Sequence, residues 1–245
     1  MGEMHTKTIS TKDLQEEQLK RMFSLMVQYY EKVSIEVFRA DIFDKQKVIL
    51  LLSSDGQIQG FSTIVELSLE AHGKKFIAIY SGDTVLEKKY WGNGALPSAF
   101  GQCLWAVKMR NPLTPVYWFL ISKGYKTYLL MTNNFPTHFP RFETKTPSKY
   151  AQVMDTFYQN RFGSSYDSTT GIIRFAANKV SFLKEDVAEI DSGTQQSPRI
   201  RFFESKNPGW RQGDELACVA KVTFWIPIRY AFKKTAKFFL KAIRK

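Results

Sequence analysis

The sequence predicts an α/β fold, and three observations predict it. Apolar residues recur at helical spacing between residues 13 and 30. A short apolar run at 47–53 ends at Asp55-Gly56, a hairpin turn signal that leads into a second strand. A second stretch with a buried helical face, 95–109, precedes another apolar run at 116–121. The first half of the chain therefore contains both helices and strands.

The first helix is expected at 13–30, with Asp13 or Thr11 as its cap. The strand at 47–53 and its hairpin partner at 57–69 are followed by a third run, 76–85, which also predicts a strand. The order to this point is a helix and three strands.

The helix at 95–109 has Pro97 in its first turn, where proline is tolerated because no backbone N–H is needed there. The run at 116–121 predicts a strand. The next apolar stretch, 128–131, fits a strand or a helix, since so short a run does not reveal its period. Prolines then predict a loop at 133–143.

A further helix is expected at 147–161, with proline in its first turn. The polar segment 191–198 predicts an exposed loop. Two strands are expected at 199–203 and 216–225, on either side of a turn at 207–209.

Composition narrows the classes of protein. The chain has 245 residues, 44% of them hydrophobic, and only two cysteines, Cys103 and Cys218, which favours a reducing cytoplasm. The N-terminal residues include no apolar signal-peptide core, and no stretch reaches the roughly 20 apolar residues that cross a bilayer. Gly2 and Thr6 meet the pattern for N-myristoylation, and an unmodified N-terminus is the alternative.

The formal charge of +12 is concentrated at the C-terminal end, where 219–245 contains no Asp or Glu. Residues 227–245 predict a basic amphipathic helix suited to an anionic membrane surface on the inner face of the membrane. A helix whose apolar face packs on the domain is the alternative. Because the charge is local and no nucleic-acid motif accompanies it, nucleic acid is not expected as a partner.

A glycine-rich loop stands between the predicted strand at 76–85 and the predicted helix at 95–109. Glycines let a backbone approach a phosphate, and a helix N-terminus adds a favourable dipole. The ordinary alternative is a strand-to-helix turn with a glycine at positive φ. The residues of the loop are Lys89, Tyr90, Trp91, Gly92, Asn93, Gly94 and Ala95.

This loop and the order of the elements resemble the GNAT acyltransferase superfamily, whose donor loop reads Gln or Arg, two variable residues, Gly, any residue, then Gly or Ala. Lys89 stands at the Gln/Arg position and departs from it, Gly92 and Gly94 match, and Val85 precedes them on the strand. The resemblance covers about residues 14–142. It implies a mixed, mainly antiparallel sheet flanked by helices, with backbone amides of 90–95 binding a phosphate of coenzyme A or of a phosphopantetheine-bearing carrier protein.

On this resemblance residues 1–145 form the donor-binding core, 146–226 its C-terminal part or extension, and 227–245 the basic helix. The resemblance also implies a carboxylate base near the end of the third strand, for which Asp83 is the first choice and Glu66 the second. A solvated carboxylate is the alternative for both.

A tyrosine that protonates the leaving thiolate is implied near Tyr125 or Tyr128, which are equally compatible with a core role. His138 and Glu143 are spaced like the His-x4-Asp signature of glycerolipid acyltransferases, with Glu in place of Asp and without a downstream Pro-Glu-Gly motif. A structural histidine is the alternative.

The sequence thus predicts an acyltransferase that moves an acyl group, a fatty one by preference, from an acyl-CoA or acyl-carrier-protein thioester to an amine or a hydroxyl. No tightly bound cofactor and no metal are expected. The alternatives are a synthase of N-acyl amino acids or acyl-homoserine lactones, which differs in its acceptor, and a non-catalytic protein that binds acyl thioesters or lipid surfaces.

Overall fold

The computed structural model describes residues 4–176, 181–184, 187 and 196–225. The strands of the main sheet follow one another in space as β1 (Met4–Ser10), β3 (Lys47–Ser53), β4 (Ile58–Ala71), β5 (Lys74–Leu86), β6 (Val116–Ser122), β11 (Glu215–Val222), β9 (Ile172–Ile173) and β8 (Tyr166–Asp167). The short strand β7 (His138–Phe139) also pairs with β11, while β2 (Tyr30–Glu31) pairs with β10 (Phe182–Leu183) in a separate ribbon.

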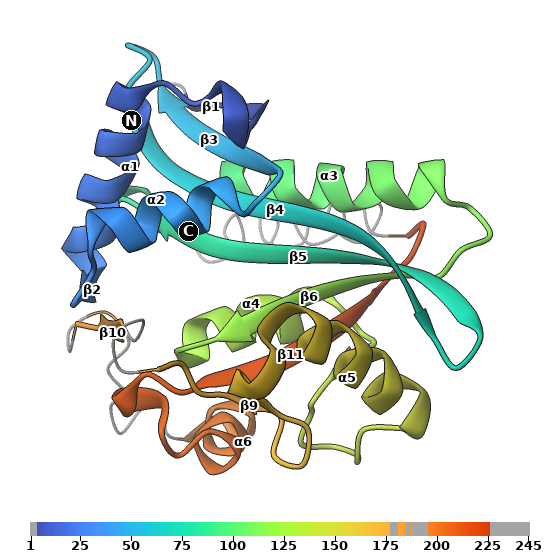
Figure 1. Cartoon of the computed structure of the whole chain (residues 1–245). Helices are drawn as coiled ribbons and strands as arrows, with labels where there is room; N and C mark the ends of the chain where they lie inside the picture. Colours follow the sequence, from blue (N-terminus) through green and yellow to red (C-terminus); the bar gives the residue numbers. More distant parts are fainter. Residues whose placement is uncertain (1–3, 177–180, 185–186, 188–195, 226–245) are drawn as a thin grey trace, which may run out of the picture.

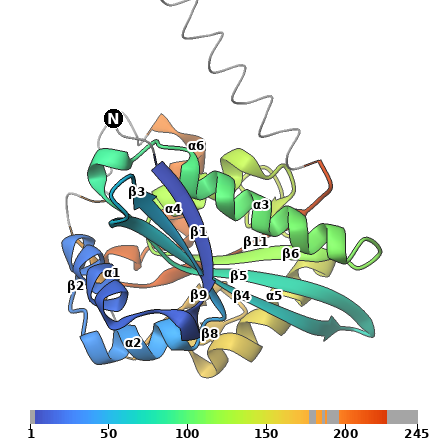
Figure 2. The ribbon, with the colours of Figure 1, turned by 90° about the horizontal axis from the view of Figure 1, so that it is seen from above.

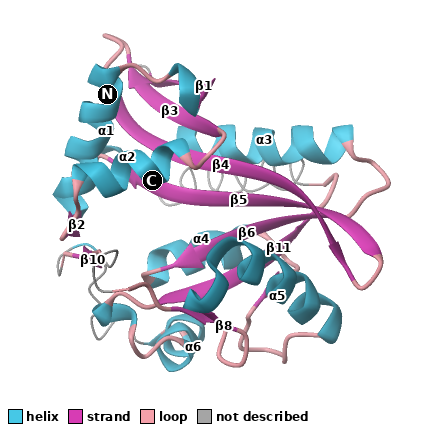
Figure 3. Cartoon of the chain, in the orientation of Figure 1, coloured by secondary structure: helices cyan, strands magenta, loops and turns pink. Residues whose placement is uncertain are grey.

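Only β5 and β6 are parallel among these pairs, so the predicted mixed, mainly antiparallel sheet is confirmed (Figure 1, Figure 3). Strand β11 lies between β6 and β9, and therefore residues beyond 146 complete the same sheet.

The helices cover both faces of the sheet. They are α1 (Glu16–Tyr29), α2 (Ile35–Phe43), α3 (Ala95–Arg110), α4 (Tyr125–Asn134), α5 (Ser148–Phe162) and α6 (Pro198–Lys206). Helices α3, α4 and α6 pack in one apolar cluster, and α1, α2 and α5 belong to two clusters on the opposite face (Figure 2).

Strand β6 shows how the sequence divides these faces, because successive side chains of a strand point to opposite sides. Trp118 and Leu120 face the cluster of α3 and α4, whereas Tyr117 and Phe119 face the cluster of α5. A near-continuous apolar run is what a central strand buried on both faces requires.

The sheet opens where β5 and β6 part. The two strands pair only over 77–81 and 116–120, and β5 continues to Leu86 without β6 beside it (Figure 1). At the same point Thr63 of β4 faces both Gly82 and Asp83, which is a β-bulge. A bulge frees one residue of the strand from the ladder and bends the strand. Both features place Asp83 at the mouth of the opening.

Most of the predicted elements are confirmed within a few residues, including the strands at 47–53, 76–85 and 116–121, the Asp55-Gly56 hairpin and the helices at 95–109 and 147–161. The first helix is also confirmed, but its cap is wrong. It begins at Glu16, and the N-cap is Gln15, whose backbone N–H donates to Gln18 Oε1 at 3.0 Å. The ambiguous stretch 128–131 lies in α4.

The predicted strand at 199–203 is wrong, because these residues belong to α6. Pro198 stands at the start of that helix, and the buried Ile200 and Phe203 are three residues apart, a helical spacing. Strand β1 and helix α2 were not predicted. Gly2 and the predicted helix at 227–245 lie outside the described residues, as does most of the predicted loop at 191–198. Among the described helices, none is both long and apolar enough to cross a membrane.

Candidate functional site

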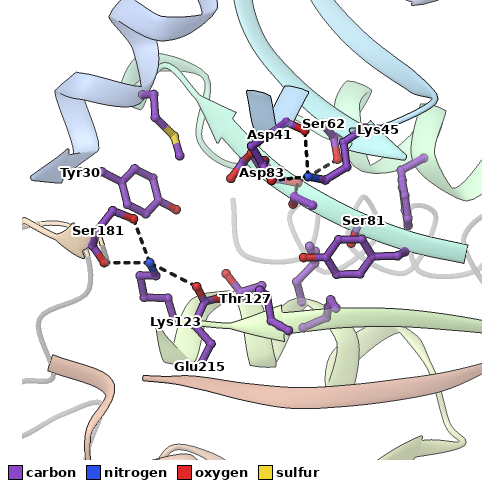
Figure 4. Close-up of a pocket in the computed structure, with 18 of the residues that line it drawn as sticks. Tyr30, Asp41, Lys45, Ser62, Ser81, Asp83, Lys123, Thr127, Ser181 and Glu215 are labelled. Atoms are coloured by element: carbon purple, nitrogen blue, oxygen red, sulfur yellow. Dashed lines mark hydrogen bonds and ion pairs between the residues drawn. The ribbon is translucent and has the colours of Figure 1, made fainter. Parts of the chain in front are cut away.

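A cavity of about 490 Å³ lies where β5 and β6 part (Figure 4). Its lining comes from both faces of the sheet, so the cavity passes through the opening between the two strands. On the side of α3 and α4 it is lined by Leu96, Pro97, Phe100, Gly101, Leu104, Trp118, Leu120, Thr127, Leu130, Asn134 and Phe135. On the side of α1, α2 and α5 the lining includes Tyr30, Val37, Phe38, Asp41, Lys45, Tyr80, Arg161 and Phe162.

Two carboxylates meet on the second of these sides. Asp83 extends from the bulge of β5, and Asp41 reaches it from α2 through a side-chain hydrogen bond (Figure 4). Lys45, which is only 4% exposed, places its Nζ 2.6 Å from Asp41 Oδ1 and 3.1 Å from the Asp41 carbonyl oxygen. Arg161 of α5 pairs with Asp44 next to this group. Two carboxylates and two cations are thus fixed around the opening.

The two carboxyl groups differ in acidity. Burial raises the pKa of Asp83 well above its ordinary value, and the charge and hydrogen bond of Asp41 raise it further. Burial also acts to raise the pKa of Asp41, but the hydrogen bond from Asp83 and the charge of Lys45 outweigh it and lower that pKa. Asp83 is therefore the weaker acid of the pair and keeps its proton to a higher pH than Asp41.

A second polar cluster lies farther along the same side. Lys123 Nζ is 3.2 Å from Glu215 Oε1, and it donates to the carbonyl oxygen and the Oγ of Ser181 at 2.8 and 2.9 Å. The ring of Tyr30 lies 5.8 Å from the same ammonium group (Figure 4). Burial raises the pKa of Glu215, and Lys123 opposes this effect. The ammonium of Lys123 has three partners, so this cluster mainly fixes the cavity wall.

Of the two predicted carboxylate bases, only Asp83 lines the cavity. Glu66 lies on β4, is not part of the lining, and pairs with Arg110 of α3 at 3.0 Å. The structure therefore brings Asp83, but not Glu66, to the opening in the sheet. The sequence interpretation missed Asp41 and Lys45.

The predicted pair of His138 and Glu143 is not formed. His138 is buried on β7, with Nδ1 2.6 Å from the carbonyl oxygen of Phe135, and burial lowers its pKa. Glu143 instead accepts a hydrogen bond from Arg141 Nε at 2.9 Å. Neither residue lines the cavity.

The two predicted tyrosines also lie away from the cavity. The face of α4 that reaches it carries Thr127, Leu130 and Asn134, whereas Tyr125 and Tyr128 are buried in the core. The hydroxyl of Tyr128 donates to the carbonyl oxygen of Pro140 at 3.1 Å. The phenols in the cavity wall are those of Tyr30 and Tyr80, and burial raises the pKa of each.

The loop before α3 is not the open phosphate cradle that the sequence predicted. Val85 is buried on β5, and Lys88–Tyr90 form a short 3-10 helix. Four backbone amides of the loop already have acceptors. Tyr90 N donates to Glu87 O at 2.8 Å, Trp91 N to Lys88 O at 3.1 Å, Asn93 N to Tyr90 O at 2.9 Å, and Ala95 N to Asn93 Oδ1 at 2.9 Å.

Gly92 has a φ of +82°, as expected for the alternative interpretation, a strand-to-helix turn. The side chain of Asn93 occupies the position in front of α3 where a phosphate oxygen would bind. Lysine side chains surround the turn: Lys89 Nζ lies 5.0 Å from the Tyr90 ring, and Lys126 Nζ lies 4.7 Å from the Trp91 ring. Positive charge is present here even though the amides are occupied.

Within the described residues, no group of three or more His, Cys, Asp or Glu side chains is arranged to hold a metal ion. No family model matches the chain, and a search of curated proteins finds no match.

Solved structures give distant matches. A protein from Enterococcus faecalis described as a "Probable N-Acyltransferase" is 18% identical over 51% of this chain and 31% of its own, with a TM-score of 0.40. An acetyltransferase from Trypanosoma brucei is 17% identical over 59% of this chain and 100% of its own, with a TM-score of 0.39. A GNAT family N-acetyltransferase from Escherichia coli in complex with CoA is 9% identical over 50% of this chain and 66% of its own, with a TM-score of 0.36.

The last of these structures is named as a member of the superfamily that the glycine loop and the element order resemble. At such identities and TM-scores the function has to be argued from the residues of the cavity itself.

Proposed function

We propose that the protein transfers an acyl group from a coenzyme A or carrier-protein thioester to an amine or hydroxyl acceptor. The observation that carries this proposal is the cavity between β5 and β6, with Asp83 held on a bulge in its lining. Its volume of about 490 Å³ is within the range of small-molecule sites. Because it is lined from both faces of the sheet, donor and acceptor can enter from opposite sides and meet at the bulge.

The donor is assigned to the side of α3 and α4. That wall is formed by apolar side chains such as Leu96, Phe100 and Leu104, which favour an acyl chain and the pantetheine arm that carries it. An apolar wall of this length also favours a fatty acyl group over an acetyl group. The phosphates are assigned to the side chains of Lys88, Lys89 and Lys126 at the turn before α3, since four of the loop amides are occupied.

The acceptor is assigned to the side of Asp41 and Asp83. Its nitrogen or oxygen lone pair attacks the thioester carbonyl carbon, a C–N or C–O bond forms, and the C–S bond breaks. The acceptor's proton passes to the ionised Asp83 carboxylate. A backbone N–H released at the bulge is suited to polarise the thioester carbonyl. The departing thiolate takes up a proton, and Tyr30 and Tyr80 are the phenols nearest this chemistry in the wall.

The experiment is a thiol-release assay. The purified chain is incubated with acetyl-, octanoyl- and palmitoyl-CoA, with and without a panel of primary amines and alcohols, and free thiol and acylated product are measured. Thiol release that depends on the acceptor supports the proposal. Donor binding without release would favour the non-catalytic alternative, and the absence of both would contradict the proposed function.

The same assay with acyl-carrier protein in place of coenzyme A separates the two donors, and an amino acid or homoserine-type acceptor in the panel tests the synthase alternative. We also propose, from the sequence alone, that the basic segment 227–245 contacts an anionic membrane. These residues lie outside those that the structure describes.

A further inference from the structure

A group of exposed apolar side chains lies around the C-terminal end of α3. Leu113 is 97% exposed and Trp225 is 65% exposed. Trp105 and Met109 are four residues apart and therefore lie on the same side of the helix. None of these side chains lines the cavity. The group is called the α3 surface and consists of Trp105, Met109, Leu113, Phe224 and Trp225.

Lys108 holds two parts of this surface together. Its Nζ donates to the carbonyl oxygens of Asn111, Pro112 and Thr114 at 3.3, 2.9 and 3.0 Å, which fixes the loop that carries Leu113. The same atom lies 4.8 Å from the ring of Phe224. Lys108 therefore links the loop that carries Leu113 to Phe224 at the C-terminal end of α3.

Positive charge borders the α3 surface. Burial, and then the charge of Lys221, lowers the pKa of Lys108, which places the exposed Lys221 close to it. On the other flank of the helix, Arg110 pairs with Glu66 at 3.0 Å, and the charge of the exposed Lys47 acts against burial, which raises the pKa of Cys103. Apolar side chains with cations beside them are the composition of a protein surface that enters a lipid headgroup layer.

The most basic part of the chain also begins here. Trp225 is the last described residue, and residues 226–245, which follow it, contain seven Lys or Arg and no Asp or Glu. This segment is joined to the α3 surface at Trp225, so an anionic surface that attracts the segment is held to the protein through that residue.

We propose that the α3 surface docks on an anionic lipid bilayer, with Leu113 and Trp225 entering the headgroup layer. Cations on the rim and in the following segment are attracted to anionic lipid, and the apolar side chains leave water for the acyl boundary. A nucleic acid would satisfy the charges but would leave the apolar side chains without an apolar partner. This docking does not depend on the proposed reaction, since the surface and the cavity share no residue.

The test uses the full chain and vesicles of phosphatidylcholine with or without phosphatidylglycerol. Binding is measured by cosedimentation and by the shift of tryptophan fluorescence. The variant combines Leu113→Ser with Trp225→Ser. Phe142→Ser is the matched control, because Phe142 is 45% exposed and lies outside the α3 surface. The proposal expects binding that requires phosphatidylglycerol and weakens with salt, at least about tenfold weaker binding for the variant, and an unchanged control.

Three results would overturn the proposal. The first is a wild-type chain that ignores the anionic vesicles, or a variant that binds them as the wild type does. The second is a variant with a lower melting temperature and unchanged vesicle binding, which would show that another segment of the chain covers the surface. The third is a wild-type dimer that the variant converts to a monomer in sedimentation, which would assign the surface to a second copy.

Discussion

The two sides of the cavity differ in charge, although they are parts of one continuous space. The residues of α3 and α4 that line it include no charged side chain, whereas the opposite side carries Asp41, Lys45 and Arg161 around Asp83. The sheet itself separates these environments, because alternate residues of β5 and β6 face opposite layers. Only the gap between the two strands lets the apolar and the charged side meet.

The difference in charge indicates which part of a reaction each side of the cavity can support. An apolar wall binds a chain without directing it, since apolar burial is non-directional. A carboxylate pair with fixed cations can hold an acceptor and take its proton, because its charges and hydrogen bonds have defined positions.

The largest expected effect is that of Asp83→Asn, which removes the proton acceptor and keeps the size of the side chain. Acceptor-dependent thiol release should fall by roughly 10²–10⁴-fold, the usual contribution of a general base. Donor binding, measured by calorimetry, should remain. Glu66→Gln makes the same chemical change on the neighbouring strand and should leave the rate near that of the wild type. Equal losses in the two variants would refute the assignment of Asp83.

A smaller, selective effect is expected on the apolar side. Gly101 lines the cavity from α3, and a Cβ added there meets no atom within 4 Å. Gly101→Leu should therefore fill the space of the acyl chain, and it should lower kcat/KM for palmitoyl-CoA by roughly 10- to 100-fold, with little change for acetyl-CoA.

Ala106→Leu is the matched control, since Ala106 is on the same helix and outside the lining. If Gly101→Leu affects short and long donors equally, the apolar side does not hold the acyl chain.

The third effect is a displacement of the pH profile. The pKa of Asp83 is raised, so the rate should increase with pH until Asp83 loses its proton. Asp41→Asn removes the neighbouring negative charge, which lowers the pKa of Asp83 and should move the rising limb to lower pH. Asp44→Asn, at an aspartate outside the cavity lining, should move it less. A profile unchanged in Asp41→Asn would show that the two carboxyl groups are not coupled.

The raised pKa of Asp83 also affects the stability of the fold. The rate should increase with pH, whereas the free energy of unfolding should decrease. Protonated Asp83 stabilises the fold at low pH, and this contribution is lost as the pH rises through the raised pKa. The wild type should therefore lose part of its free energy of unfolding over that range, and Asp83→Asn should lose less, because Glu215, whose pKa is also raised, remains. Urea unfolding at a series of pH values measures this difference.

Much of the fold was predictable because its signals are local. The Asp55-Gly56 turn fixed the first hairpin, and a proline marked the start of α3, where Pro97 is in the first turn, and of α5, where Pro147 is the N-cap. The prediction for segment 199–203 failed because five residues are too few to distinguish a strand from a helix, and the helix depends on Ile200 and Phe203 packing in the core. Strand β1 failed for a related reason, since its largely exposed residues become a strand only through pairing with β3.

The site was less predictable, because it depends on contacts between distant segments. Asp83 was found from its position near the end of a strand, but the partner that changes its acidity, Asp41, lies on a helix that was not predicted. His138 and Glu143 had the right spacing, yet each found a nearer local partner. The sequence of the glycine loop has the expected glycines. It does not reveal that nearby carbonyl oxygens and the Asn93 side chain accept hydrogen bonds from the backbone amides of the loop.

The smallest expected effects come from adding a methyl group to one glycine on each side of the cavity. Gly101 is in a helix with open space around it, so Gly101→Ala should raise the free energy of unfolding by about 0.5–1 kcal/mol through helix propensity. At Gly82 a Cβ would lie 2.6 Å from Thr63 Oγ1 and 2.7 Å from Lys45 Cε. Lys45 is buried and tied to Asp41 there, so Gly82→Ala should cost about 1–3 kcal/mol. Urea unfolding of both variants measures the difference, and shifts of the same sign would show that the charged side is no more tightly packed than the apolar side.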